Sequence, residues 1–172
     1  LLPKYASKQA DSKINNMIAF KSILFFILAP GTVAGLFPLL FFRNGNQINT
    51  GVFSYLAFPL WLIGLATLIW CFWDFVQKGK GTPAPNDPPK ELVVAGLYKY
   101  VRNPMYVGVF FINLGYFLWF GYWNLLLYLA LYFIAVHSFV TLYEEPHLKK
   151  IFGASYEEYM KKTPRWIPRF NL

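Results

Sequence analysis

Residues 105–143 read MYVGVFFINLGYFLWFGYWNLLLYLALYFIAVHSFVTLY and contain no Asp, Glu, Lys or Arg. As one straight helix these 39 residues would extend about 58 Å, nearly twice the roughly 30 Å hydrocarbon thickness of a bilayer. The stretch must therefore fold back. The sequence FGYWN at 120–124 supplies a turn, with a glycine, an amide and aromatic rings that suit a membrane interface. We predict one membrane helix over 105–120 and another over 123–143.

Two further apolar runs precede this stretch, at 18–42 and 52–76. Pro30-Gly31 and Pro38 interrupt the first run, so we expect a kink or a re-entrant bend there. The first run is also open to interpretation as a secretory signal peptide, although it is long and no clear cleavage site follows it. The chain begins with Leu1 rather than Met, so we expect a short N-terminal piece to be missing.

The composition excludes several classes of protein. The 172 residues are 56% hydrophobic, 21% aromatic and 14% charged, whereas a soluble domain carries about 25% charged residues. These values argue against a soluble globular domain, a disordered chain and a collagen-like repeat. One cysteine and two histidines exclude an intramolecular disulfide and a CxxC metal site, and they make a metal centre improbable. The fold class that we predict is an all-α, integral membrane helical bundle of about four transmembrane helices with a cytoplasmic amphipathic helix at 147–162. Gly153 is a candidate break in this tail helix, with a second helix starting near Ala154 or Ser155.

The positive charges follow the expected topology. The net charge is +8, and fifteen of the sixteen Lys and Arg residues would lie on one side of a four-helix arrangement, with Arg43 as the exception. By the positive-inside rule both termini and the loop 77–104 are cytoplasmic. The net positive charge then reflects topology and attraction to anionic membrane lipid, rather than binding of nucleic acid.

The chain divides into an N-terminal part, 1–90, and a C-terminal part, 91–172. The segment QKGKGTPAPNDPPK at 77–90 is rich in proline and glycine and forms neither a regular helix nor a central strand. It is either a plain linker or a flap over a site at the cytoplasmic face.

Three polar clusters should converge on that face, at 96–106, 144–147 and 163–169. Arginine side chains suit a carboxylate or phosphate, and the paired glutamates suit an ammonium or sulfonium group. The aromatic rings can stack on a planar ring or face a cation. The candidate groups are Arg102, Arg165, Arg169, Glu144, Glu145, Tyr98, Tyr106 and Trp166. Asn103 and Pro104 also have a purely structural interpretation, as the N-cap and first residue of a helix.

These clusters resemble the superfamily of isoprenylcysteine carboxyl methyltransferases and phospholipid methyltransferases, over residues 92–169. The first block of the pattern is Gly96, Tyr98, Arg102, Asn103, Pro104, Tyr106 and Gly108. The second is Glu144, Glu145, Leu148, Phe152, Gly153, Tyr156 and Tyr159. The third is Pro164, Arg165, Ile167 and Pro168.

The resemblance implies a membrane enzyme that binds S-adenosylmethionine at the cytoplasmic face and methylates a lipophilic or small-molecule acceptor. It implies that Glu145 and Arg102 are catalytic. The cofactor-binding residues that it implies are Tyr98, Arg102, Asn103, Pro104, Tyr106, Gly108, Glu144, Glu145, Arg165 and Trp166.

Two positions depart from the pattern of the carboxyl methyltransferases. Asn103 stands where those enzymes usually have His, and Val140 stands where they often have an Arg for the substrate carboxylate. Both departures weaken a prenylcysteine carboxylate as the substrate, so the acceptor stays open.

Other interpretations remain at this stage. A membrane reductase of related architecture would bind NADPH instead, and a small membrane scaffold would bind neither cofactor. His137 within an apolar helix is either a hydrogen-bonding partner of a neighbouring helix or a chemical group. Cys71 is either a small buried residue or a nucleophile.

Overall fold

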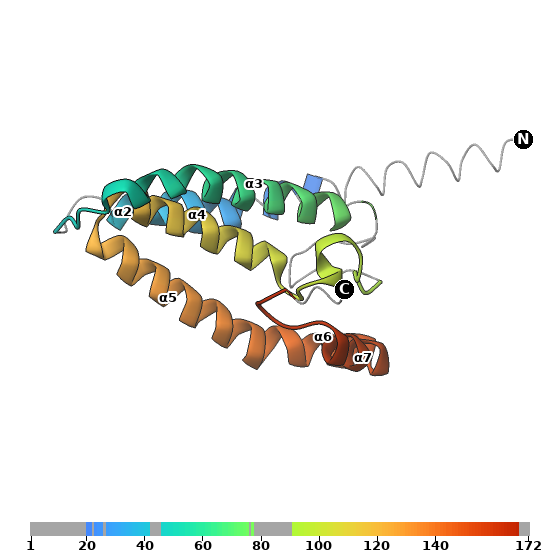
Figure 1. The fold of residues 1–172 in the computed structure, drawn as a ribbon. Helices are drawn as coiled ribbons and strands as arrows, with labels where there is room; N and C mark the ends of the chain where they lie inside the picture. The colour runs from blue at the N-terminus through green and yellow to red at the C-terminus, as the bar shows by residue number, and fades with distance from the viewer. Residues whose placement is uncertain are drawn as a thin grey trace, which may run out of the picture.

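The computed structural model describes residues 20–21, 23–25, 27–41, 46–75, 77 and 91–168. Over these residues the protein is helical and has no strand, apart from one isolated bridge between Gln47 and Tyr122 (Figure 1). The lysines of the first 19 residues, the greater part of the predicted loop 77–90 and Arg169 lie outside the described residues. The all-α prediction is confirmed for the part of the chain that is described.

The first apolar run is helical at its described positions, and it is irregular where the sequence predicts a disturbance. Directly after Pro30-Gly31 the helix widens into a π-helix, η1 (Thr32–Leu36), which continues as α2 (Phe37–Phe41). A proline removes one backbone donor from the helical ladder, and a local change of hydrogen-bond pattern accommodates that loss.

The second run forms the 3₁₀ turn η2 (Gly51–Leu56) and the helix α3 (Ala57–Asp74). The long uncharged stretch folds as the predicted hairpin of α4 (Pro104–Phe120) and α5 (Trp123–Phe139). Gly121 has a φ of 68° in the turn, and a β-carbon there would collide with the carbonyl oxygen of Ile48. Only glycine meets both conditions without strain.

The predicted end of the fourth helix at residue 143 is wrong. From α5 the chain continues through a π-helical turn, η5 (Val140–Glu144), directly into α6 (Glu145–Phe152). The wide turn of η5 comes just before Pro146 and shifts the hydrogen-bond pattern, so the helix passes the proline without ending.

The tail helix predicted over 147–162 begins earlier, within the run that continues from α5, and the expected interruption at Gly153 is confirmed. Gly153, with a φ of 55°, ends α6, and α7 (Ala154–Lys162) follows as a separate helix.

Two helical runs are long and apolar enough to cross a membrane, Gly51–Asp74 with 24 residues and Trp123–Phe152 with 30 residues. The helix α4 is a shorter apolar helix. In Figure 1 α3 and α4 lie side by side, whereas α5 diverges from α4 with distance from the hairpin turn.

The loop before α3 and the hairpin turn lie at the same end of the molecule. The amide of Ile48 donates to the carbonyl of Gly121 (2.6 Å), and the amide of Trp123 donates to the carbonyl of Asn46 (3.2 Å). The segment before α4 and residues 163–168 lie away from this end, towards the opposite end of the molecule (Figure 1).

Small residues bring α3 and α4 into close contact. A β-carbon on Gly64 would lie 2.7 Å from the carbonyl oxygen of Gly108 and 2.7 Å from a side-chain carbon of Ile112. Further along, Gly115 leaves room for the indole of Trp61, which donates to the carbonyl of Ile112 (3.2 Å). Close helix approach through small residues is a common way to stabilise helix pairs within membranes.

We expect Gly64→Val to force α3 and α4 apart and to destabilise the protein by about 1–3 kcal/mol, the usual cost of overpacking. Thermal unfolding in detergent measures the effect. Gly35→Val is the matched control, because nothing lies within 4 Å of a β-carbon at Gly35. Equal midpoints for the two variants would contradict close packing at Gly64.

Candidate active site

Three segments that are distant in the sequence meet at the start of α4. They are residues 96–103, which include the 3₁₀ turn η4 (Gly96–Lys99), the junction of η5 and α6, and residues 163–168, which we call the C-terminal strap. In Figure 1 the strap runs back from α7 towards the start of α4. The structure thus brings together the three polar clusters that the sequence singles out.

The carboxylate of Glu145 is the centre of this junction and is 5% exposed. Arg165 binds it with two nitrogens, Nε to Oε1 and Nη2 to Oε2, both at 2.8 Å. Arg102 Nη1 lies 3.0 Å from Oε1. The hydrogen bonds to Glu145 raise the pKa of the Arg165 guanidinium, which is therefore charged at neutral pH. Both carboxylate oxygens are therefore held by arginine.

Backbone and side-chain hydrogen bonds fasten the strap to the segment before α4. The Arg102 amide donates to the Pro164 carbonyl (2.9 Å), and Asn103 Nδ2 donates to the Arg165 carbonyl (3.2 Å). Asn103 is at the N-cap position and Pro104 in the first turn, as predicted, but the Asn103 side chain makes no capping bond.

The phenol of Tyr159 adds a bond from α7 to the carbonyl of Tyr98 (2.6 Å). Burial raises the pKa of both tyrosines, so their hydroxyls stay neutral donors.

The two adjacent glutamates have different partners. Whereas Glu145 binds arginine, Glu144 Oε2 accepts a hydrogen bond from the Tyr106 hydroxyl (3.2 Å). The backbone carbonyl of Tyr106 in turn accepts from the Tyr132 hydroxyl (2.9 Å), which ties α4 to α5. The environment, rather than the residue type, therefore distinguishes Glu144 from Glu145.

Trp166 of the strap lies among aromatic rings of α4 and α5. Its ring centroid is 6.5 Å from that of Tyr106 and 5.7 Å from that of Phe133. Its indole N–H donates to Nδ1 of His137 (3.1 Å). His137 thus hydrogen-bonds the strap, and not a neighbouring helix as the sequence suggested.

Two cavities adjoin Tyr106. One, of about 380 Å³, lies between α4, α5 and the strap, and Phe110, Phe133 and Trp166 are among its lining residues. The other, of about 260 Å³, lies between α4, α5 and the described part of the first apolar run, residues 20–21, 23–25 and 27–41, which we call the first helical segment. Phe25, Pro30 and Val33 of this segment line the cavity. Tyr106, Tyr132 and Val136 line both cavities.

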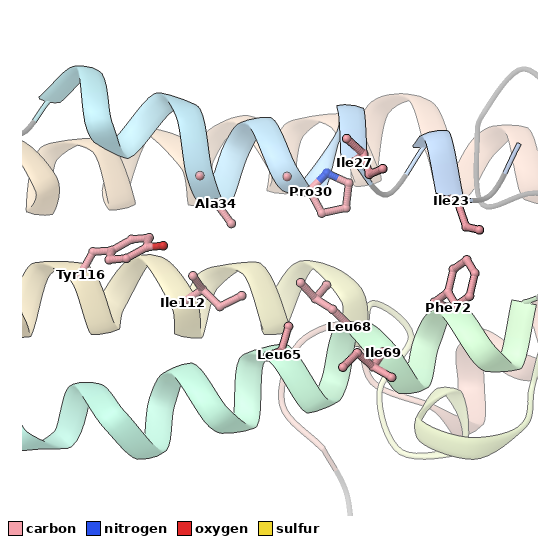
Figure 2. Close-up of a pocket in the computed structure, with 12 residues that line it drawn as sticks. Ile23, Ile27, Pro30, Ala34, Leu65, Leu68, Ile69, Phe72, Ile112 and Tyr116 are labelled. Carbon is pink, nitrogen blue, oxygen red and sulfur yellow. The ribbon is translucent and has the colours of Figure 1, made fainter. Parts of the chain in front are cut away.

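A third hollow, of about 490 Å³, lies between the first helical segment and the pair α3–α4 (Figure 2). Pro30 lines this hollow as well as the 260 Å³ cavity. Figure 2 shows apolar side chains from all three helices facing it, with the Tyr116 hydroxyl as the polar exception among the labelled groups. These spaces suit hydrocarbon.

Of the ten predicted cofactor-binding residues, Tyr106 and Trp166 line the cavities described above. Two of the others, Tyr98 and Gly108, have packing contacts instead. Tyr98 is buried in a core cluster with Cys71, Val93 and Met105. Gly108 packs against Gly64 and Thr67 of α3. Cys71 is fully buried in the same cluster, consistent with a small core residue.

No sequence motif indicated the roles of Tyr132, Phe133 and Asp74, and the contact of His137 with the strap follows from neither of its two sequence interpretations. Tyr132, Phe133 and His137 are near the strap, and the spacing of Phe133 and His137 puts both rings on one helix face, a usable signal. Asp74, buried at the end of α3, lies where a β-carbon on Gly96 would collide with its carboxylate.

In the part of the chain that is described, no group of three or more His, Cys, Asp or Glu residues could hold a metal.

The sequence model of the phospholipid methyltransferase family matches residues 52–155. The chain belongs to this family. The match begins in η2, upstream of the region where the sequence motifs show the resemblance, so α3 is part of the family region. It ends before the strap.

A protein-S-isoprenylcysteine O-methyltransferase of Schizosaccharomyces pombe is 42% identical over 77 residues, which are 45% of this chain and 33% of the relative. The aligned region thus spans about a third of the length of the curated relative that it matches.

We expect Glu145→Ala to be strongly destabilising, by about 3–5 kcal/mol, because it leaves two buried or half-buried arginines without their counter-charge. Thermal unfolding in detergent would show a large drop in the midpoint. Glu158→Ala is the matched control, since Glu158 is exposed and pairs with Lys162 on the surface of α7. A similar small effect of both variants would contradict a structural role for the ion pair.

Proposed function

We propose that this protein is an integral membrane methyltransferase that uses S-adenosylmethionine and acts on a lipophilic acceptor at the cytoplasmic membrane face. Membership of the phospholipid methyltransferase family supports the reaction class. The observation on which the proposal depends is the buried Arg102–Glu145–Arg165 cluster, because it fastens the strap beside a partly open cavity of about 380 Å³. Ligand sites of proteins typically have volumes of roughly 300–1,000 Å³.

The groups at the junction fit the chemistry of S-adenosylmethionine. The carboxylate of Glu144 can accept hydrogen bonds from an ammonium group, since Tyr106 is its only hydrogen-bond donor among the described residues. Arg102 Nε is buried and has no hydrogen-bond acceptor among the described residues, so it retains a donor for a carboxylate. The rings of Tyr106, Phe133 and Trp166 offer faces and edges for a planar heterocycle.

The two glutamates receive different roles in this proposal. Because arginine holds both oxygens of Glu145, we assign it, with Arg102, to the assembly of the site. Glu144 then makes the direct contact. It binds the amino group of the cofactor or, where the acceptor is an amine, accepts the proton that the amine releases. This assignment refines the expectation that Glu145 and Arg102 are themselves catalytic.

When bound, S-adenosylmethionine supplies a methyl group that its sulfonium already activates. The protein then needs to align the acceptor and exclude water. Orientation of reacting groups contributes roughly 7–11 kcal/mol in favourable cases. The strap covers the site from the water side, and the largely apolar lining of both cavities keeps the surroundings dry.

The apolar cavity on the far side of Tyr106 suits the lipophilic acceptor. It is bounded by helices that face the bilayer, whereas the strap-side cavity lies at the end where polar groups gather. Acceptors of the family and of the fission yeast relative, as their names state, are phospholipid and isoprenylcysteine. Asn103 and Val140 do not favour a carboxylate acceptor, so we propose only a lipophilic molecule.

We further propose four membrane crossings with both termini and the site on the cytoplasmic side. The loop before α3 pairs with the hairpin turn at one end, which fits an antiparallel arrangement. Exposed lysines gather near the other end, as the positive-inside rule requires; they are Lys99, Lys149, Lys150, Lys161 and Lys162.

Calorimetric titration of the detergent-purified chain with S-adenosylhomocysteine tests the function. We expect saturable binding that Glu144→Gln weakens about 10- to 100-fold, because a hydrogen bond to a charged group is worth about 1.5–3 kcal/mol. Glu157→Gln, on the exposed face of α7, is the control and should bind like the wild type. Binding of NADPH in place of S-adenosylhomocysteine would overturn the methyltransferase proposal in favour of a reductase.

Cysteine labelling tests the topology. Cys71 is fully buried, so the wild-type protein should not react with a membrane-impermeant maleimide. In right-side-out vesicles we expect Gln47→Cys to be labelled and Ser155→Cys to be protected until the vesicles are permeabilised. Both side chains are exposed. Labelling of Ser155→Cys in intact vesicles would rule out a cytoplasmic site.

A further inference from the structure

We infer that His137 is a positioning residue that holds Trp166 of the strap in place as a wall of the cofactor cavity. This inference rests on the proposed function. It concerns a pair of which the family match covers His137 but not Trp166, because that match ends at residue 155. The geometry of this chain is therefore the basis for the contact between them.

The hydrogen bond between the two side chains fixes the state of the imidazole. The indole N–H of Trp166 is a donor only, so Nδ1 of His137 must accept, at 3.1 Å. The neutral imidazole then carries its proton on Nε2. A side chain with an acceptor at the position of Nδ1 can replace His137 in this role, and an aliphatic side chain cannot.

Ring contacts complete the packing around the indole of Trp166. Phe133 and His137 lie one turn apart on α5, and their ring centroids are 5.7 Å and 6.1 Å from that of Trp166. Tyr106 of α4 contacts the indole as well, at 6.5 Å. The rings limit the position of the indole, and the hydrogen bond to His137 fixes its rotation.

The strap needs this attachment because its other bonds lie upstream. Arg165 is held by Glu145 and Asn103, but Ile167, directly after Trp166, is 78% exposed. Trp166, Ile167 and Pro168 all line the 380 Å³ cavity. Trp166–His137 is thus the last side-chain hydrogen bond of the described strap, at the place where the strap forms a wall of the cavity.

Two measurements on the full chain in detergent test the inference. The first is the ¹⁵N indole NMR spectrum of tryptophan-labelled protein without ligand. The chain has six tryptophans, and Trp166→Phe identifies the signal of Trp166 by its loss. We expect His137→Leu to move that signal away from a hydrogen-bonded position, whereas His137→Asn, whose Oδ1 can accept, restores it.

The second measurement is the affinity for S-adenosylhomocysteine. We expect His137→Leu to weaken binding about two- to tenfold, the range for a net hydrogen bond, and His137→Asn to stay within about twofold of the wild type. In the Trp166→Phe background His137→Leu should have no further effect. His147→Leu is the control, because His147 stacks on Tyr143 and has no bond to the strap. If His137→Leu does not fold, Trp166→Phe must itself show the two- to tenfold loss of affinity for S-adenosylhomocysteine.

The outcomes separate this inference from the proposed function. The positioning role would be overturned by an unchanged Trp166 signal in His137→Leu. It would also be overturned by equal losses of S-adenosylhomocysteine affinity in the His137→Leu, His137→Asn and His147→Leu variants. In either case, binding by the wild type would leave the methyltransferase proposal intact. Failure of the wild type to bind S-adenosylhomocysteine would overturn the proposed function and the cofactor part of the inference. In that case the indole spectrum still decides whether His137 positions Trp166.

Discussion

A buried carboxylate needs counter-charge, and at Glu145 that requirement joins the segment before α4 to the C-terminal strap. Burial of an unpaired ionised group costs several kcal/mol, which is comparable with the net stability of a protein. Glu145 meets the requirement with one arginine before α4 and one in the strap. The two segments therefore come together at this carboxylate, and the Asn103 and Trp166 hydrogen bonds are formed around that junction.

Two helical features place the junction. The glycine contacts between α3 and α4 fix where α4 begins, and with it Arg102 and Asn103. The run from α5 through η5 into α6 is one continuous helix, so Glu144 and Glu145 are held rigidly relative to His137 and Tyr132. The π turn matters because it allows the helix to pass Pro146 and so extends this rigid element to the site.

The proposed function requires one water-soluble and one lipophilic ligand, and Tyr106 lies between the two cavities assigned to them. Its side chain lies between a cavity at the strap and a cavity towards the first helical segment, and its hydroxyl binds Glu144. A group in this position can contact both ligands and keep their entrances separate. Its backbone carbonyl accepts a hydrogen bond from the Tyr132 hydroxyl, which restricts movement of Tyr106.

The sequence by itself determined the hairpin of α4 and α5, because 39 uncharged residues exceed one crossing and contain a glycine turn. It also determined the set of polar groups that meet, since charged side chains in a mostly apolar chain gather at its ends.

Only the tertiary structure decided which partner each group has. Glu144 and Glu145 are neighbours in sequence, yet one binds Tyr106 and the other two arginines, because successive residues of a helix point in different directions. Tyr98 and Gly108 belong to the same motif as Arg102, but they pack in the core and against α3. Contacts between residues 20 or more positions apart depend on how the helices pack, which no local pattern encodes.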